Sequence, residues 1–426
     1  MAGALPDTIV ALSSGRPPAA IAVIRTSGPR ALEAAQALAG RVPAPRRASL
    51  RHFRNPADGR PIDRGLVVYF PGPNSATGED IVEYQCHGSK AVVAAMIAAL
   101  TAGPGMRPAE PGEFTRRALA NGRIDLTQAE GLAELLEAES EAQRVSALRR
   151  AEGGLRRQIE QWRGELLDLS AEAEVAIDYT DEEDGAVVFD PAPRLAALIA
   201  ALDTLLAAPR VERLRDGVRL VVAGPPNAGK SSLVNALAGE DRAIVTAIAG
   251  TTRDLIEIPL SIAGVPLTLI DTAGLRDTDA EIERIGIGLA EREIARADLL
   301  LWLGAERDLP EHPRAVLIAS KADLHEKKTG LRISVVDNQG IEALKRWIAA
   351  QSALLIPTTE QPGLNEREAA LLSECQEALT RAADLRDPVL IAEELRLARS
   401  GLDRISGATG IDHLLDALFA RFCLGK

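Results

Sequence analysis

The pattern of hydrophobic and polar residues changes near residue 120, from short strand-like runs to helical periodicity. Short β-like runs broken by glycine and proline fill roughly the first 120 residues, with strands predicted at 21–25 and 65–70, a loop at 70–75 and a helix at 91–100. This mixture predicts an α+β domain. From Leu126, apolar residues recur at helical intervals to about Ile177, and again over 191–208. Thr127 and Glu130 have the spacing of a capping box at the start of this stretch.

Four short apolar runs in the second half are typical of buried parallel strands, and they lie at 219–224, 267–270, 299–303 and 315–318. Helix-like segments alternate with them, which predicts a doubly wound α/β domain. Residues 357–363 have the composition of a linker, and helical periodicity returns over 365–423. The expected architecture is multidomain: an α+β domain (1–121), a helical bundle (122–214 with 363–426) and an inserted α/β domain (215–362).

Composition narrows the class of protein. The 426 residues are 46% hydrophobic and 26% charged, as in soluble globular chains. No apolar run approaches the ~20 residues that span a bilayer, and the N-terminus lacks the pattern of a signal peptide. The three cysteines are far apart and lack metal-ligand spacing. We therefore expect a cytoplasmic protein that does not associate with membranes.

The net charge of −12 predicts no whole-molecule attraction to nucleic acid. We expect the richest local basic cluster to lie in the predicted helices, where it consists of Arg144, Arg149, Arg150, Arg156, Arg157 and Arg163. Glutamates are interleaved with these arginines. The pattern therefore favours a solvated helix face over a nucleic-acid site.

A phosphate-binding pattern comes directly after the first buried strand. Gly224, Gly229, Lys230 and Ser231 match the P-loop pattern, with a strand before and a helix after. Glycines allow backbone N–H groups to point at phosphate oxygens, while the lysine neutralises the β and γ phosphates and the serine hydroxyl holds Mg²⁺. The residues expected at the phosphates are Asn227, Ala228, Gly229, Lys230, Ser231 and Ser232. A chance glycine-rich turn is the alternative, and the flanking elements argue against it.

Two further segments fit a nucleotide switch. Asp271, Thr272, Ala273 and Gly274 directly follow the predicted strand at 267–270, where a carboxylate can make a water-mediated Mg²⁺ contact and an amide can meet the γ-phosphate. Between this motif and the P-loop lies the sequence Gly-Thr-Thr-Arg-Asp at 250–254, placed to supply a threonine to Mg²⁺. The three motifs in this order predict a phosphate-hydrolysing switch protein.

Base identity depends on the segment after the fourth strand. The Asp323 carboxylate can accept two hydrogen bonds from guanine, a pair that adenine does not offer, and Lys321 can cover the ring. We therefore expect GTP rather than ATP. Ser320 stands where this guanine motif usually has asparagine, and Ser334-Val335 replaces the usual Ser-Ala base loop. The segment 304–330 is also short, so weakened base affinity is expected.

Motifs in three regions carry a family resemblance. They are Phe70-Pro-Gly-Pro-Asn-Ser75, Pro111-Gly-Glu-Phe114, Asp125-Leu-Thr-Gln-Ala-Glu130, Glu283-Arg-Ile-Gly286 and Phe422-Cys-Leu-Gly-Lys426. Together with the P-loop they resemble the MnmE (TrmE) family of tRNA-modification GTPases over residues 6–426. The resemblance implies a homodimer whose N-terminal domain binds a 5-formyl-tetrahydrofolate-type donor through Arg25, Glu83, Arg123 and Lys426. The family usually has lysine at position 123.

The resemblance also implies a set of ions at the bound GTP or GDP. K⁺ would be held by the Asn227 side chain and by carbonyls of Thr246, Ile248 and Thr251, and would take the place of an arginine finger. Mg²⁺ would be held by Ser231 and Thr252. The catalytic residues would be Lys230 and Glu283, the latter positioning the attacking water. The switch residues expected around the nucleotide are Thr246, Ala247, Ile248, Ala249, Gly250, Thr251 and Thr252.

The implied partners are tRNA and the FAD-containing protein MnmG, with which the homodimer would form a heterotetramer that modifies C5 of the wobble uridine. A ribosome-assembly GTPase is one alternative. It predicts a basic RNA-binding module after the GTPase domain, whereas 365–426 has an acidic-to-neutral balance. A nucleotide-gated folate-binding scaffold is another. Asn227, Thr252 and Glu283 argue against that scaffold, while Ser320 and the short 304–330 segment favour it.

Overall fold

The protein is described from a computed structural model, which places residues 7–178, 189–241, 256–271, 290–324, 329–357, 363–408, 418, 419, 422 and 425. The described residues form two compact units. One lies within Met1–Ala133 and Ser406–Lys426, and the other is Glu134–Ile405. The finer domain boundaries stay a prediction. None of the helices in the described ranges combines the length and apolar character needed to cross a membrane.

The first unit is built on a six-stranded sheet of order β3-β4-β5-β2-β1-β6. All neighbouring strands run antiparallel except β1 and β6. The strands are β1 (Thr8–Leu12), β2 (Ala19–Ser27), β3 (Ser49–Arg54), β4 (Pro61–Phe70), β5 (Ile81–Gly88) and β6 (Met106–Pro108). The predicted strands at 21–25 and 65–70 fall within β2 and β4. The α+β character predicted for this region is therefore confirmed.

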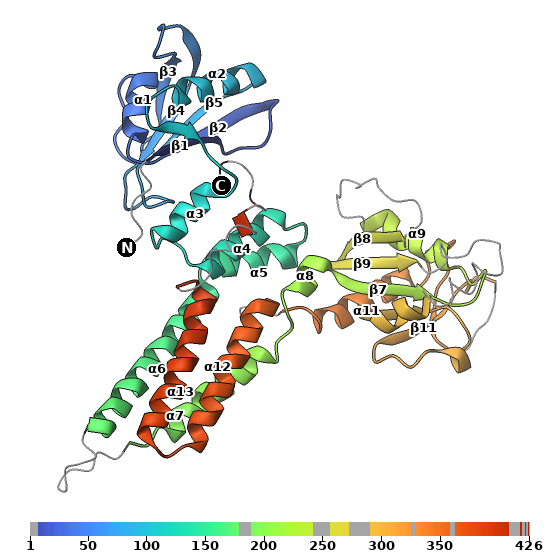
Figure 1. The fold of residues 1–426 in the computed structure, drawn as a ribbon. Coiled ribbons are helices and arrows are strands. Elements are labelled where there is room, and N and C mark those ends of the chain that lie inside the picture. The colour runs from blue at the N-terminus through green and yellow to red at the C-terminus, as the bar shows by residue number, and fades with distance from the viewer. Residues whose placement is uncertain are drawn as a thin grey trace, which may run out of the picture. The chain divides into compact units, whose positions relative to one another are not determined.

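Two helices cover one face of this sheet: α1 (Ala31–Ala39) and α2 (Lys90–Thr101) (Figure 1). Alternate strand residues such as Ile24, Phe53 and Tyr84 pack against Leu38 and Met96 of the helices. Because neighbouring residues of a strand point to opposite faces, residues one position away, including Arg25 and Glu83, lie on the face opposite the helices.

The remaining helices of this unit are α3 (Glu113–Ala120) and most of α4 (Leu126–Glu137). The predicted capping box at Thr127 and Glu130 is wrong. Asp125 Oδ1 instead accepts from Gln128 N at 2.9 Å, and Gln128 Oε1 accepts from Asp125 N at 3.2 Å. Thr127 is fully buried and donates to Asp125, so it is unavailable as a cap.

The helical part of the second unit comprises α5 (Glu141–Ala151), α6 (Gly154–Asp178), α7 (Ala192–Leu206), α12 (Glu366–Asp384) and α13 (Pro388–Ser406). Leu166, Leu198, Leu372 and Leu395, one from each of the last four, belong to one apolar core. This confirms that the two helical stretches flanking the α/β insertion pack together as a bundle (Figure 1).

The insertion contains a six-stranded sheet of order β12-β11-β10-β7-β9-β8, parallel except at the β8 edge. Its elements are α8 (Glu212–Asp216), β7 (Val218–Ala223), α9 (Lys230–Asp241), β8 (Ile256–Ile262), β9 (Val265–Asp271), β10 (Leu299–Trp302), β11 (Ala315–Ala319), β12 (Leu331–Arg332) and α11 (Ile341–Ala353). Helices α9 and α11 cover one face, and helical residues 290–296 cover the other. The doubly wound α/β prediction is confirmed.

Candidate functional site

The P-loop connects β7 to α9 as the sequence predicts. Gly224 has a φ of +145°, and a Cβ atom there would lie 3.1 Å from the Leu303 backbone. Glycine therefore fits at this turn better than a residue with a side chain. Asn227 adopts the left-handed region that asparagine tolerates, with a φ of 60°. Lys230, the first residue of α9, is 6% exposed, and its Nζ donates to the Gly224 carbonyl at 3.0 Å and the Pro225 carbonyl at 2.8 Å. The Lys230 ammonium is therefore buried and lies against the backbone of the P-loop.

Two groups expected near Mg²⁺ lie together beside this lysine. Ser231 Oγ donates to Asp271 Oδ2 at 3.2 Å. Asp271 is 8% exposed and ends β9, which is the parallel neighbour of β7. Adjacent parallel strands end at the same edge of a sheet, so the register of β7 and β9 brings together a hydroxyl and a carboxylate 40 residues apart in sequence.

A cavity of about 600 Å³ opens over Lys230 and Ser231, and its walls are Pro226, Asn227, Gly229, Lys230, Ser231, Ser232 and Lys321. Five of the six residues predicted at the phosphates therefore line one hollow. Its chemistry suits an anion, because it combines two lysine side chains with the N-terminus of α9. The residues present fit a bound nucleoside triphosphate with Mg²⁺.

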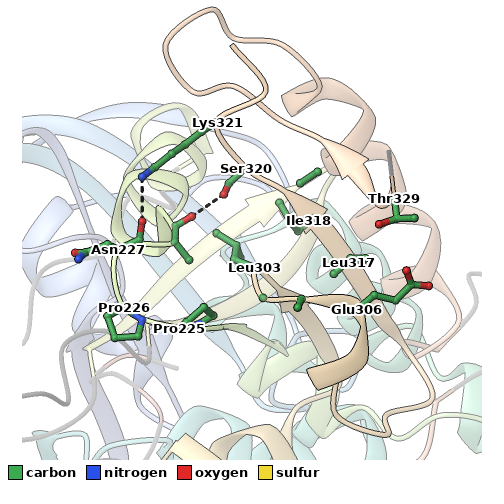
Figure 2. Close-up of a pocket in the computed structure, with 14 residues that line it drawn as sticks. Pro225, Pro226, Asn227, Leu303, Glu306, Leu317, Ile318, Ser320, Lys321 and Thr329 are labelled. Atoms are coloured by element: carbon green, nitrogen blue, oxygen red, sulfur yellow. Dashed lines mark hydrogen bonds between the residues drawn. The ribbon is translucent and has the colours of Figure 1, made fainter. Parts of the chain in front are cut away.

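The segment predicted to recognise the base is joined to the P-loop by two side-chain hydrogen bonds. Ser320 Oγ donates to the Ala228 carbonyl at 2.7 Å, and Lys321 Nζ donates to the Asn227 carbonyl at 3.0 Å (Figure 2). Ser320 thus uses its single donor on the loop backbone. Asp323 is exposed near the end of this segment, where a ligand can reach its carboxylate. The serine therefore joins the base segment to the phosphate loop.

Removing the Ser320 hydroxyl tests this role. Ser320→Ala should weaken binding of a fluorescent GDP analogue about 2–10-fold, since a hydrogen bond of this type contributes roughly 0.5–1.5 kcal/mol. Ser320→Thr keeps the donor and should bind as the unaltered protein does. A fluorescence titration measures both. Unchanged affinity in Ser320→Ala would show that this hydrogen bond is not needed to hold the base segment.

The shortness predicted for 304–330 is visible in the connection from β10 to β11. Between these parallel strands the chain makes only one short helical turn, a 3₁₀ helix at Glu306–Asp308. Parallel neighbours are usually joined by a full α-helix. Here the space beside the strand ends is a cavity of about 550 Å³, bounded by P-loop residues Pro225 to Ala228 and by Leu303, Leu317 and Ser320 among others (Figure 2).

Several predicted site residues lie outside the described ranges. They are Thr246, Ala247, Ile248, Ala249, Gly250, Thr251 and Thr252, then Thr272, Ala273, Gly274 and Glu283, and the terminal Lys426. Their roles stay predictions. Of the residues predicted to hold K⁺ or Mg²⁺, Asn227 and Ser231 are described, and both line the cavity over the P-loop.

In the first unit, pairing of β2 with β5 brings Arg25 and Glu83 together. The Arg25 Nη2 atom lies 2.7 Å and its Nε atom 3.0 Å from Glu83 Oε1. The two side chains remain 24% and 19% exposed, so the pair is half-buried and accessible. The Arg25 guanidinium also lies 5.7 Å from the centre of the Phe114 ring. Sequence reasoning assigned no role to Phe114, because only the fold brings α3 to this strand.

Arg123 is exposed, and among the described residues its side chain makes no hydrogen bond or ion pair with Arg25 or Glu83. The turn that carries it is held in place nearby: Asn121 Nδ2 donates to the Thr77 carbonyl at 2.7 Å. The structure therefore joins two of the predicted folate residues directly and leaves the third on an ordered turn.

A buried network supports this turn. Arg117 is 1% exposed and donates to Glu79 Oε2 at 3.1 Å and to Glu113 Oε1 at 3.0 Å. Burial raises the pKa of Glu113, but hydrogen bonds from Arg107, the Glu110 backbone and Arg117 outweigh it and hold that pKa below its usual range. The carboxylate is therefore ionised at neutral pH and fixes Arg117.

The end of the chain lies beside the first strand. Ser13 Oγ donates to the Gly425 carbonyl at 3.0 Å, and the backbone of Leu12 closely approaches Gly425. Leu12 and Ser13 are next to Ala11, which pairs with Arg25 across β1 and β2. No signal in the local sequence indicates this hydrogen bond, which joins residues 412 positions apart.

Comparisons with known proteins agree on one family. The family model for the GTP-binding protein TrmE N-terminus matches residues 8–123, and that for the MnmE helical domain matches residues 126–423. A tRNA modification GTPase MnmE from Novosphingobium aromaticivorans is 49% identical, covering 99% of this chain and 100% of its own. The protein of that name from Erythrobacter litoralis is also 49% identical, with 99% and 100% coverage. These full-length matches complete what the P-loop site indicates: the chain belongs to the MnmE family of tRNA modification GTPases.

Proposed function

We propose that GTP hydrolysis in the P-loop site of this chain drives modification of C5 of the wobble uridine in certain tRNAs. The observation that carries the proposal is the hydrogen bond from Ser231 Oγ to Asp271 Oδ2 at 3.2 Å, beside the buried Lys230 ammonium. Such a hydroxyl and carboxylate hold Mg²⁺ and its water shell, and the lysine neutralises the β and γ phosphates. Family membership supports GTP as the nucleotide.

Potassium is the proposed source of additional positive charge. The Asn227 side chain would bind it together with carbonyls of the Thr246–Thr251 segment. This assignment is supported by the position of Asn227 on the wall of the phosphate cavity. Such a cation supplies the charge that an arginine finger gives other GTPases, an effect of ~10³–10⁵ in rate. Thr252 would complete the Mg²⁺ ligands, and Glu283 would position the attacking water.

The first unit is proposed to bind a tetrahydrofolate one-carbon donor. The accessible Arg25–Glu83 pair, the neighbouring Phe114 ring, exposed Arg123 and terminal Lys426 form the proposed residue set. An arginine can pair with a folate carboxylate, and an aromatic ring can pack on a pterin. Arg25→Leu should weaken binding of 5-formyl-tetrahydrofolate in isothermal titration, whereas unchanged affinity would remove Arg25 from the site.

The proposed assembly is a homodimer that joins the FAD-containing MnmG in a heterotetramer. GTP hydrolysis would reorganise this complex through the switch segments. The added group would be aminomethyl or carboxymethylaminomethyl, with folate as carbon donor. The family resemblance supports these partners, whereas the P-loop site supports the nucleotide chemistry. The two parts of the proposal can therefore be tested separately.

One assay distinguishes the proposal from its alternatives. Hydrolysis of GTP and of ATP is measured with the full chain in equal concentrations of KCl or NaCl, with and without MnmG. We expect GTP turnover at least about tenfold faster in potassium than in sodium, and negligible ATP turnover. Equal rates in the two salts would remove potassium from the mechanism. Preference for ATP would overturn the guanine assignment, and no turnover in any condition would favour the folate-binding scaffold.

A further inference from the structure

The first unit carries a basic surface that the proposed function does not use. Between Arg41 and Arg64 there are seven arginines and two aspartates, a net charge of +5 in a chain whose total is −12. The segment runs from the loop after α1 through β3 into β4. Six of the seven arginines are exposed, and Arg51 is half-buried. This Arg41–Arg64 surface has one more arginine and a larger net charge than the helical cluster identified in the sequence.

The position of the surface makes it accessible. Strand β3 is the edge of the six-stranded sheet, beside β4 (Figure 1). Phe53 points into the core below α1 and α2, so its neighbour His52 points to the opposite face. Arg64 pairs with His52 across the two strands and shares that face. Both side chains are exposed, so His52 and Arg64 lie on the open face beside the sheet edge.

Acidic groups leave most of this charge unneutralised. Asp58 lies 3.6 Å from Arg60, and among the described residues this is the one ion pair that an arginine of the surface makes. The Asp63 carboxylate accepts from His87 instead. Arg51 and Arg54 donate to backbone carbonyls, and the Arg46 guanidinium packs 5.6 Å from the Phe70 ring centre. In the part of the chain that the structure describes, the side chains of Arg41, Arg47 and Arg64 have no hydrogen-bond or ion-pair partner.

The helical arginines differ from this surface. Arg144 pairs with Glu141 at 2.7 Å, Arg156 with Glu160 at 2.8 Å and Arg163 with Asp403 at 2.7 Å. Arg150 is fully buried against Glu368. The three partly exposed pairs agree with the solvated face favoured by the sequence, whereas the prediction is wrong for Arg150, which is buried. The hypothesis that the helical cluster is the richest basic patch is wrong, because the Arg41–Arg64 segment is both richer and less neutralised.

Protection of a sheet edge is the simplest structural explanation for charge on β3, since exposed edges with charged residues resist pairing with other chains. It accounts for Arg51 and Arg54, which belong to β3 itself. It does not account for the other five, which lie in the preceding loop, in the hairpin turn and on the inner neighbour β4. The spread of charge over three segments fits an extended polyanion better than a single strand edge.

We propose that the Arg41–Arg64 surface binds the phosphate backbone of the RNA substrate. The identity of the polyanion as tRNA rests on the proposed function. An arginine guanidinium can donate two parallel hydrogen bonds to a phosphate group. Each such contact releases cations that had condensed on the RNA, which favours binding at low salt. Because the remainder of the chain is strongly acidic, this surface also orients the RNA. Backbone contacts position RNA without reading its bases.

The test replaces Arg41, Arg47, Arg54 and Arg64 with glutamine in the full-length protein. The control replaces Arg194, Arg381, Arg396 and Arg404, which form exposed ion pairs in the helices, and changes the net charge equally. Binding of a fluorescein-labelled unmodified tRNA is followed by anisotropy from about 50 to 200 mM KCl, a range over which binding through phosphates weakens steeply. We expect the surface variant to bind at least about tenfold more weakly, with a salt slope shallower by roughly one for each arginine that no longer binds a phosphate.

The control variant should retain the affinity and the slope of the unaltered protein. Equal salt slopes in the surface variant and the unaltered protein would overturn the proposal. So would loss of the dimer in light scattering, or loss of MnmG binding, with tRNA affinity unchanged, because either result would assign the surface to a protein partner. GTP turnover of the surface variant should equal that of the unaltered protein. Absence of turnover in the unaltered protein would contradict the proposed GTPase while leaving the RNA measurement decisive.

Discussion

Replacing Lys230 with methionine should lower the rate of GTP hydrolysis by about 10²–10³-fold or more, the loss typical of removing one group that stabilises transition-state charge. Lys230 is 6% exposed, and its ammonium donates to the Gly224 and Pro225 carbonyls beside the cavity over the P-loop. Methionine has similar length and no charge, so it fills the space without neutralising the phosphates. Release of inorganic phosphate under saturating GTP measures the effect.

The matched control for this substitution is Asn235→Ala, on the exposed side of the same helix α9. It should hydrolyse GTP as the unaltered protein does, and both variants should give the circular dichroism spectrum of a folded chain. A Lys230→Met protein that is folded and retains more than about a tenth of the original rate would contradict the assignment of this lysine to transition-state charge.

Replacing Arg150, which pairs with buried Glu368 and also with Glu134, should lower the free energy of unfolding by about 3–5 kcal/mol, because the Glu368 carboxylate then stays buried without its ion-pair partner. The Arg150 and Glu368 side chains are both 0% exposed, and Arg150 Nη1 lies 2.9 Å from Glu368 Oε2. Arg150 also donates to the Gly363 carbonyl at 2.7 Å, where the chain returns from the α/β insertion to α12. Urea unfolding followed by circular dichroism of Arg150→Met measures the loss.

The double variant Arg150→Met with Glu368→Gln separates charge from packing. Glutamine retains the capping box that Glu368 forms with Asn365, so the main change is removal of both charges. We expect it to recover most of the stability that Arg150→Met loses. Arg396→Met, which breaks an exposed pair with Glu393, should unfold at nearly the same urea concentration as the unaltered protein. Additive losses in the double variant would show that the two charges do not depend on each other.

The elements of the fold were predictable where periodicity is strong. The four apolar runs of the α/β insertion became β7, β9, β10 and β11, because buried parallel strands carry continuous apolar sequence. The start of α4 was not predicted correctly. Asp125 with Gln128 and Thr127 with Glu130 both have capping spacing, and only the burial of Thr127 decides between them.

The residues of a binding site that lies within one short segment were likewise predictable from the sequence. The P-loop places its glycines, Lys230 and Ser231 by local backbone geometry, so eight consecutive residues specify the anion site. Ser320, which the sequence marks as a departure from the guanine motif, has a defined partner in the structure. Its hydroxyl reaches the Ala228 carbonyl, a hydrogen bond between residues 92 positions apart. That hydrogen bond depends on the register of β11 against its neighbours.

By itself, the sequence determined the family, the order of the domains and the residues of the phosphate loop, because these follow from local motifs and from hydrophobic periodicity. The tertiary structure alone decided which distant groups meet: Ser231 with Asp271, Arg25 with Phe114, and Arg150 with Glu368. It also decided which arginines are neutralised and which remain open on the Arg41–Arg64 surface. Such contacts depend on strand register and helix packing, which are set by the whole core and not by neighbouring residues.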